Sequence, residues 1–222
     1  MVKHISPAKN ILHDHVLYWF CVFCFILIGG LLLLRFDQGY FLEFFSANRQ
    51  AWLNQFFIYG TRLGEEFSYL IFTILFLFIR FRYALLIPLT GFMVTIISFL
   101  SKSFFLHPRP SAYYKQLGTL QDITLVDGVT LLGGLTSFPS GHTMSGFALF
   151  TLIAFLSLKK QWIGFLCFIL ALVVGISRIY LVQHFLKDVY VGALMGVGIA
   201  TAIYYWQSQY PKDVTNWIDR KI

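Results

Sequence analysis

Charged side chains are scarce in this sequence. Asp, Glu, Lys and Arg make up only 12% of its 222 residues, about half the fraction typical of soluble domains. Apolar residues fill the difference, at 58% of the chain, and the mean hydropathy is +0.71. A soluble globular domain is therefore excluded, and the long apolar runs predict an integral membrane protein of the all-α class.

Acidic residues are the rarer of the two charged kinds. The chain has 10 Asp and Glu against 17 Lys and Arg, which gives a net charge of +7. The basic residues are scattered between apolar runs and do not line one face, so the sequence argues against a nucleic-acid partner. We expect membrane topology to explain their distribution.

Cysteine is also rare. The three cysteines, Cys21, Cys24 and Cys167, all lie inside apolar runs. Cys21 and Cys24 have the spacing of a redox motif, but their surroundings offer nothing polar that would lower a thiol pKa. We interpret all three as small buried hydrophobic residues, and they imply neither a disulfide framework nor a compartment.

The apolar runs predict a single domain over residues 1–222, built as a helical bundle with six transmembrane helices. The segment before the fourth predicted helix is rich in Gly, Pro, Ser and Thr, as expected of a loop. Residues 36–65 alternate aromatic and polar side chains, which fits either a helix lying in the membrane interface or a loop that caps a site. The predicted transmembrane helices are 15–35, 66–80, 83–101, 140–158, 162–180 and 189–206, and the outer loops are 36–65, 102–139 and 181–188.

Six spans put both termini on the same side of the membrane. By the positive-inside rule that side is cytoplasmic, because each of its segments is basic. The residues concerned are Lys3, Lys9, Arg80, Arg82, Lys159, Lys160, Lys212, Arg220 and Lys221. The outer side also carries basic residues, against the rule, and a shared anionic ligand would explain them. They are Lys102, Arg109, Lys115, Arg178 and Lys187.

One outer segment, residues 177–188, combines an Arg, a His and an Asp within an apolar protein. His184 and Asp188 are four residues apart and would share a face on one helical turn. The carboxylate would fix the tautomer of the imidazole and leave its other nitrogen free as a nucleophile or base. Arg178 adds a planar set of donors that suits a phosphate.

Two other segments are expected on the same outer face. Lys102 and Arg109, at the end of the third predicted helix, add a mobile point charge and a rigid guanidinium. Ser140, Gly141 and His142 open the fourth predicted helix, where free N–H groups and the helix dipole attract anions. Gly141 would allow a ligand close to the backbone, and His142 can carry a proton.

Together these segments predict a site for a phosphoryl group. Three cations around one tetrahedral anion would stabilise the transition state of its transfer, and two histidines suit the tasks of nucleophile and leaving-group acid. A zinc site formed by His142, His184 and Asp188 is disfavoured, because the neighbouring cations would repel a divalent metal. Cations that merely extend to the membrane interface would not gather from three segments.

The three segments match a known signature. Residues 102–110 read Lys-x6-Arg-Pro, residues 139–142 read Pro-Ser-Gly-His, and residues 177–188 read Ser-Arg-x5-His-x3-Asp. In this order the motifs resemble the type 2 phosphatidic acid phosphatase family, which shares them with vanadium haloperoxidases and glucose-6-phosphatase. The motifs cover residues 102–188, and the six-helix layout extends the resemblance over most of the chain.

The resemblance implies a role for each motif residue. His184 would be the nucleophile that forms a phosphohistidine, and Asp188 would orient and polarise it. His142 would protonate the leaving oxygen and later help a water molecule to attack. The residues that would hold the phosphoryl oxygens are Lys102, Arg109, Ser140, Gly141 and Arg178. The resemblance also implies an all-helical core with its site at the outer membrane surface, and no metal or other cofactor.

The expected function is hydrolysis of a phosphomonoester or pyrophosphate of a membrane lipid. Undecaprenyl pyrophosphate, phosphatidylglycerophosphate, phosphatidic acid and lipid A are the substrates that the resemblance implies. Two alternatives stay open: a lipid-to-lipid phosphotransferase that uses the same phosphohistidine, and a non-catalytic anion carrier. We expect a bacterial inner membrane location with the active site facing the periplasm or outside, and no obligatory protein partner.

Overall fold

The computed structural model describes residues 7–157, 161–210 and 217–220, and over these ranges it contains helices and no strands. The all-α prediction is therefore confirmed. The α-helices are α1 (Pro7–Asp14), α2 (Val16–Arg35), α3 (Tyr40–Ala47), α4 (Ala51–Arg62), α5 (Glu66–Leu77), α6 (Phe81–Phe105), α7 (Pro110–Leu117), α8 (Gly141–Leu156), α9 (Gln161–Tyr180) and α10 (Leu186–Ser208). Two short 3₁₀ helices are η1 (Leu120–Asp122) and η2 (Trp217–Asp219).

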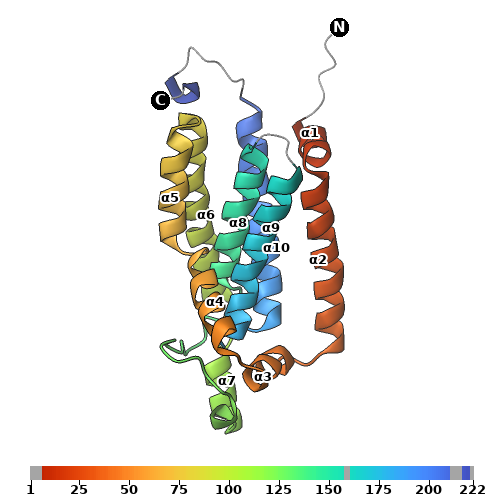
Figure 1. The fold of residues 1–222 in the computed structure, drawn as a ribbon, viewed down its shortest axis with the longest axis vertical. Coiled ribbons are helices and arrows are strands. Elements are labelled where there is room, and N and C mark those ends of the chain that lie inside the picture. The colour runs from red at the N-terminus through yellow and green to blue at the C-terminus, as the bar shows by residue number, and fades with distance from the viewer. Residues whose placement is uncertain (1–6, 158–160, 211–216, 221–222) are drawn as a thin grey trace.

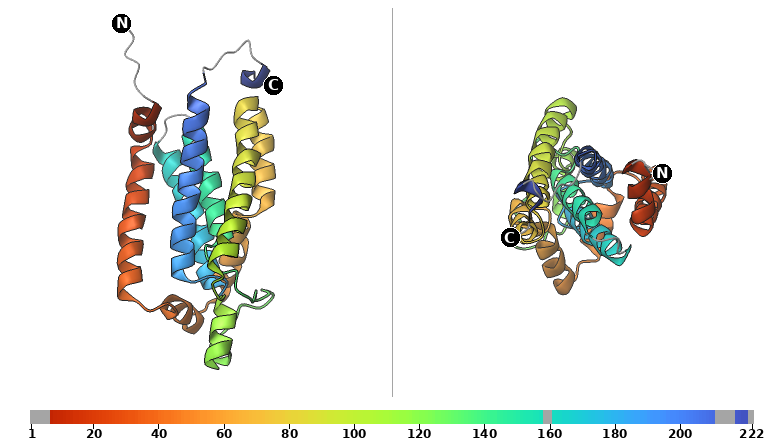
Figure 2. Two further views of the ribbon diagram at one scale, coloured as in Figure 1. Left: turned by 180° about the vertical axis from the view of Figure 1, so that it is seen from behind. Right: turned by 90° about the horizontal axis from the view of Figure 1, so that it is seen from above.

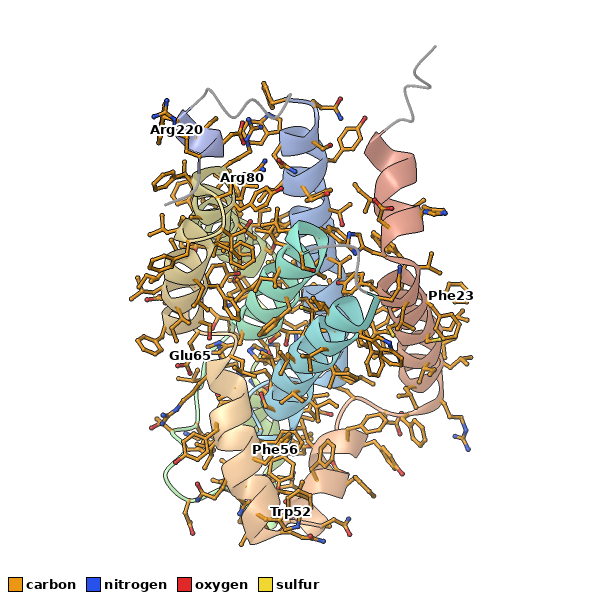
Figure 3. All side chains as sticks on the ribbon, turned by 45° about the horizontal axis from the view of Figure 1, so that its top comes forward. Phe23, Trp52, Phe56, Glu65, Arg80 and Arg220 are labelled. Carbon is orange, nitrogen blue, oxygen red and sulfur yellow. The ribbon has the colours of Figure 1, made fainter. Side chains whose placement is uncertain are left out.

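Four helical segments in the described ranges are long and apolar enough to cross a membrane: α2, the run Phe81–Leu117 that contains α6, α9 and α10. The other two predicted spans fall on shorter apolar helices, α5 with 12 residues and α8 with 16. Large apolar side chains project outward from α2, such as Phe20 at 60% exposure and Leu34 at 87%. Phe23 on the same helix points away from the bundle (Figure 3). Such side chains need an apolar surrounding, which supports a membrane-embedded chain.

Helix α8 runs through the centre of the bundle, with α9, α10 and α6 packed around it (Figures 1 and 2). Every residue from 146 to 156 is buried. A helix that is apolar on all sides is expected where protein, and not solvent, surrounds it. Two side-chain hydrogen bonds tie outer helices to this centre, one between Tyr18 of α2 and Thr151, the other from Tyr69 of α5 to the carbonyl of Ser145 at 2.9 Å.

Glycines let α10 approach α8 closely. A Cβ atom on Gly192 would lie 2.6 Å from the carbonyl oxygen of Ser140, and one on Gly196 would lie 2.9 Å from the backbone nitrogen of Ala148. Real Cβ atoms do not reach such distances, so only glycine fits at these two positions. This close approach brings the N-terminal ends of α8 and α10 together, and the candidate site lies there.

The first and last described helices lie at the same end of the bundle, opposite α3 and α7 (Figure 1). Asp219 of η2 is buried against the start of α6, where its carboxylate lies 2.5 Å from Nη2 of Arg82 and 3.6 Å from Nη1 of Arg80. Arg80 and Arg220 can be seen at this end in Figure 3. The basic residues predicted to mark this end at positions 3, 159, 160, 212 and 221 lie outside the described residues.

The segment 36–65, for which a helix and a capping loop were both open, contains the two helices α3 and α4. Both pack against α9. The ring of Tyr180, the last residue of α9, lies 4.5 Å from that of Phe57 and 5.5 Å from that of Phe45. The aromatic residues of this segment therefore cover the end of α9, next to the candidate site.

The other two predicted loops are also partly helical. Within 102–139, α6 continues to Phe105 and Pro110 opens α7, because a proline is favoured in the first turn of a helix. Within 181–188, α10 already begins at Leu186. The predicted loop boundaries at these two places were wrong by about one helical turn.

Substitution of Gly196 by alanine tests the contact between α8 and α10. The added methyl group would overlap the backbone of α8, so Gly196→Ala is expected to destabilise the protein by about 1–3 kcal/mol in spite of the better helix propensity of alanine. Gly198, on the same helix, has nothing within 4 Å of its would-be Cβ atom. Gly198→Ala should therefore leave the melting temperature in detergent unchanged or higher. Equal melting temperatures for the two variants would contradict the packing described here.

Candidate active site

His184 and Asp188 meet at the turn between α9 and α10. Nδ1 of His184 lies 3.5 Å from Oδ2 of Asp188, and both side chains are buried. The predicted pairing is therefore present, but the helical turn predicted to hold it was wrong: His184 precedes α10, which begins at Leu186. Asp188 instead caps its own helix, because Oδ2 accepts a hydrogen bond of 3.0 Å from the backbone N–H of Phe185.

The backbone of this turn is tightly folded. The N–H groups of Gln183 and His184 both donate to the carbonyl of Arg178, at 2.9 Å and 3.1 Å. Val182 has φ of +57°, a conformation that a β-branched residue rarely adopts. Strained residues of this kind gather at functional sites, where the surroundings hold them in place. The turn fixes the imidazole of His184 directly after the last turn of α9, which carries Arg178.

Ser137 joins His184 and Asp188, and the sequence analysis did not single it out. Its hydroxyl donates to Oδ2 of Asp188 at 2.5 Å, and its oxygen lies 3.4 Å from Nδ1 of His184. The side chain is fully buried. Nδ1–H of His184 can thus be shared between the serine oxygen and the carboxylate, which assigns the proton to Nδ1 and leaves Nε2 with a lone pair.

Burial sets the charge of His184. The side chain is only 1% exposed, and burial lowers its pKa from 6.5 to about 4, with Arg178 and Arg109 acting in the same direction and Asp188 opposing them. The imidazole is therefore neutral at physiological pH. A neutral imidazole with a free lone pair is the form that can attack an electrophile.

The N-terminus of α8 forms the second part of the site. The hydroxyl oxygen of Ser140 accepts from the hydroxyl and the backbone N–H of Thr143, at 2.9 Å and 3.4 Å, so Ser140 is the N-cap. Its own proton is left to donate to a ligand. A Cβ atom on Gly141 would lie 3.2 Å from Nζ of Lys102. The ammonium group of Lys102 therefore lies against the anion-attracting end of α8.

Two buried guanidinium groups complete the cationic part. Arg109 donates from Nη1 to the carbonyl of Gln183 at 3.3 Å and from Nε to Thr136 at 3.3 Å. Arg178 donates from Nη1 to the hydroxyl of Thr61 in α4 at 2.8 Å, while its buried Nε has no hydrogen-bond partner in the described part of the protein. Both act electrostatically on Lys102. Cations buried this closely repel each other, and a bound anion would relieve that repulsion.

His142 faces the mouth of the site, where a carboxylate approaches it. Nε2 of His142 lies 4.0 Å from Oε1 of Glu65, at the junction of α4 and α5 (Figure 3). Lys102, His142 and Glu65 line one end of a cavity of about 790 Å³. The cavity continues along α6 past Phe99, Thr95, Gly91 and Pro88, with Tyr69 and Phe67 of α5 on its other side.

The structure thus brings all eight predicted site residues together. They are Lys102, Arg109, Ser140, Gly141, His142, Arg178, His184 and Asp188. Two other outer cations do not join them: Lys115 is exposed on α7, and Lys187 is held by Gln38 at 2.5 Å and by Nε2 of His107 at 2.8 Å. No anionic ligand is therefore needed to explain the positions of these two residues. Among the described side chains, no group of three or more His, Cys, Asp or Glu clusters as a metal site would require.

Sequence reasoning missed three residues that contact the site, namely Ser137, Thr61 and Glu65. Ser137 lies three residues before Ser140, so its nearness to a motif was a usable signal. Thr61 and Glu65 come from the segment whose role was open, and only the packing of α4 against α9 brings them to the site. Nothing local in the sequence indicated either residue.

The region that contains this site is similar to known proteins. The family model of the PAP2 superfamily matches residues 81–212. Phosphatidylglycerophosphatase B of Bacillus subtilis (strain 168) is 39% identical over 69 residues, which cover 28% of this chain and 34% of that protein. The matched segments span about a third of the length of the curated relatives, from 31% to 36%.

Two solved structures have the same fold over most of the chain. LpxE of Aquifex aeolicus aligns with a TM-score of 0.65 and 26% identity, over 79% of this chain and 98% of the other. The first transmembrane PAP2 type phosphatidylglycerolphosphate phosphatase from Bacillus subtilis aligns with a TM-score of 0.63 and 21% identity, over 88% of this chain and 98% of the other.

Ser137→Ala tests the contact of the serine with the His184–Asp188 pair. Without the hydroxyl, Asp188 loses a hydrogen bond to its charge and the imidazole loses one of its two orienting partners. We expect kcat for phosphate release to fall about 10- to 100-fold with little change in KM, as for the loss of one hydrogen bond to a charged group.

Ser111→Ala is the matched control. That serine also fastens the loop before α8, through a hydrogen bond of 2.8 Å to the carbonyl of Leu132, but it is not part of the site. The Ser111 variant should keep the wild-type kcat. A Ser137→Ala protein that is as active as wild type would refute the assignment of Ser137 as an orienting residue.

Proposed function

This chain belongs to the PAP2 superfamily, and from that premise we propose that it is a metal-independent phosphatase of membrane lipid phosphates. One observation carries the proposal: a buried neutral His184, oriented by Asp188 and next to Arg109 and Arg178, shares its site with Lys102 and His142, which line one end of a largely apolar cavity. The nucleophile and the charge that stabilises a phosphoryl group are thus close to a space for a lipid chain.

Binding of the phosphoryl group depends on the cations and on α8. Lys102, Arg109 and Arg178 neutralise its oxygens, and the free N–H groups at the start of α8 donate to it. The unpartnered Nε of Arg178 is available for one such bond. Because the two guanidinium groups are buried and held by hydrogen bonds before the substrate arrives, they stabilise the transition state without reorganisation.

In the first step, Nε2 of His184 attacks phosphorus and the bond from phosphorus to the leaving oxygen breaks. The electron pair stays on that oxygen, and the imidazolium of His142 gives it a proton. Asp188 and Ser137 hold Nδ1–H, so the positive charge that develops on the ring of His184 faces a carboxylate. The products of this step are a lipid alcohol, or a lipid monophosphate if the substrate is a pyrophosphate, and the phosphohistidine.

In the second step, neutral His142 takes a proton from water while the water oxygen attacks phosphorus. The P–N bond breaks, its electron pair returns to His184, and inorganic phosphate leaves. His142 is an imidazolium again and His184 is neutral, so the cycle is closed. The cations serve the same purpose in both steps, because both transition states spread charge over the same phosphoryl oxygens.

The cavity favours a lipid as substrate. From Lys102 to Pro88 it follows α6 for about 21 Å, at 1.5 Å per residue, which is longer than the roughly 15 Å of hydrocarbon in one leaflet. Its walls beyond the charged end are mostly apolar, with Phe67, Tyr69 and Phe99 among them. We infer that the phosphate head lies among the cations while one hydrocarbon chain lies along α5 and α6. Undecaprenyl pyrophosphate, phosphatidylglycerophosphate, phosphatidic acid and lipid A all satisfy this requirement.

The membrane arrangement that fits this function has six crossing helices, α2, α5, α6, α8, α9 and α10. Helix α8 is only about 24 Å long, but it is surrounded by protein and need not match the bilayer thickness. Arg80, Arg82 and Arg220 lie at the end opposite the site, which by the positive-inside rule is cytoplasmic. The site would then face the periplasm or the outside of a bacterial inner membrane.

His184→Ala tests the reaction. Purified protein in detergent, with a chelator present, should release phosphate from at least one of undecaprenyl pyrophosphate, phosphatidylglycerophosphate, phosphatidic acid and lipid A. Removal of the nucleophile should lower kcat at least about 10³-fold. His13→Ala, at an exposed histidine in α1, is the control and should be fully active.

The outcomes separate the proposal from its alternatives. Full activity of His184→Ala would refute the nucleophile. Transfer of phosphate to an added acceptor lipid, with no release to water, would identify a phosphotransferase. Phosphate flux through vesicles that persists in the His184→Ala protein, with no hydrolysis by wild type, would identify a carrier.

Thr95→Trp tests whether the cavity binds the hydrocarbon chain. Thr95 is exposed inside the cavity, and a tryptophan there would fill it between the site and Gly91. We expect kcat/KM to fall at least about tenfold for long-chain phosphatidic acid and to stay unchanged for p-nitrophenyl phosphate, which has no chain. Ile96→Trp, at the next residue but outside the cavity, is the control. Equal losses on both substrates would contradict the assignment.

A further inference from the structure

Glu65 is the carboxylate nearest to His142 among the described residues. Its Oε1 lies 4.0 Å from Nε2 of His142, and both side chains are partly exposed at the mouth of the cavity. The backbone makes this approach possible: a Cβ atom on Gly64 would lie 2.7 Å from the carbonyl oxygen of His142. The turn between α4 and α5 is thus packed directly on the first turn of α8.

The same segment is fastened to the site from the other side. Thr61, at the end of α4, accepts the hydrogen bond of Arg178, and the hydroxyl of Ser68 in α5 donates to the carbonyl of Arg62 at 3.2 Å. Glu65 lies between these two contacts. Its position opposite His142 is therefore built into the structure and does not depend on a free loop.

The charges around His142 make this carboxylate important. Burial of His142 disfavours its charged form, and four groups add to this effect: Arg178 from α9, His184 from the loop after α9, Lys102 from α6 and Arg109 from the loop after α6. All four disfavour an imidazolium, since three are cations and the fourth can become one. Oδ2 of Asp188 accepts from Ser137 and from the N–H of Phe185 and faces His184, so this carboxylate serves the other histidine. Glu65 also acts on the guanidinium of Arg178, and it is the acidic group within 4.0 Å that can stabilise a proton on His142.

We propose that Glu65 is a positioning residue that keeps His142 protonated until it donates its proton to the leaving oxygen. This inference rests on the proposed function, in which His142 is the leaving-group acid. As the proton moves to the leaving oxygen, His142 becomes neutral and Glu65 stays ionised. His142 later takes a proton from water, and the next cycle can begin.

Glu65→Gln keeps the shape of the side chain and removes its charge. Two substrates separate the expected effect from a structural one. Dioctanoyl phosphatidic acid has an alcohol leaving group that needs a proton, whereas p-nitrophenyl phosphate has a leaving group that departs without one. We expect kcat to fall about 10- to 100-fold on the lipid, within the range for loss of acid catalysis, and less than about twofold on p-nitrophenyl phosphate.

The pH profile provides a second signature. Removal of a carboxylate lowers the pKa of a neighbouring imidazolium, and His142 must be protonated at the start of the cycle. The alkaline limb of the kcat profile on the lipid should therefore move to lower pH in Glu65→Gln, by about one pH unit for a partly exposed pair at this distance. Glu65→Asp should restore part of the activity and part of the shift.

Asp127→Asn is the matched control, since it also turns an exposed acid into its amide, in the loop before α8 and away from His142. It should behave as wild type on both substrates.

Equal losses of Glu65→Gln on both substrates, or an unmoved alkaline limb, would overturn the proposal. If Glu65→Gln does not fold, as judged by size-exclusion chromatography, the same comparison is made with Glu65→Asp, whose unmoved alkaline limb would equally overturn it. A wild-type protein that releases no phosphate from either substrate or from the lipid panel would instead refute the proposed function itself, and this inference with it.

Discussion

A single backbone hydrogen bond joins the two helix starts on which the site is built. The N–H of Ser140 donates to the carbonyl of Asp188 at 3.0 Å, next to the point where Gly192 touches the carbonyl of Ser140. Because α8 and α10 meet there without intervening side chains, the anion-attracting end of α8 lies beside the His184–Asp188 pair. Any side chain at Gly192 would push the two helix starts apart. The donors and the nucleophile would then no longer be directed at the same group.

The site contains more positive than negative charge. Lys102, Arg109 and Arg178 are gathered where Asp188 is the only fully buried carboxylate in the described part of the site. Burial of like charges is unfavourable in the empty protein, and the unpartnered Nε of Arg178 adds to this. The apolar helices around α8 provide the stability that allows it. Under the proposed function a dianionic phosphoryl group would remove the imbalance, and its affinity would follow from the same repulsion between the cations.

Much of this could be read from the sequence, because membrane helices have a strong signal. The apolar runs predicted the helices to within a few residues, and the three motifs predicted which side chains meet. The geometry of His184 and Asp188 could not be predicted in detail. Their spacing of four suggested a helical turn, whereas the observed contact arises because Asp188 caps α10 and the chain before it folds back on Arg178.

The residues that sequence reasoning missed share one physical cause. Ser137, Thr61 and Glu65 reach the site through tertiary packing. Thr61 and Glu65 have no motif beside them in the sequence, and the one local signal for Ser137 was its place three residues before Ser140. The segment 36–65 in particular is ambiguous, since an aromatic and polar alternation suits a helix at the membrane surface as well as a cover for a site. The aromatic contacts of Phe45 and Phe57 with Tyr180 resolve it in favour of a cover made of helices.

The uneven exposure of the two histidines bears on the proposed choice between water and a second lipid as acceptor of the phosphate. His184 is 1% exposed, while the side chains of His142 and Glu65 are 38% and 44% exposed. A buried nucleophile keeps its lone pair free of solvent, but a base that activates water must be reached by water. A phosphotransferase needs the opposite arrangement, since water at the phosphohistidine would destroy the intermediate before an acceptor arrived. In the proposed mechanism the more exposed side of the site is the side of the acid and base, and this favours hydrolysis over transfer.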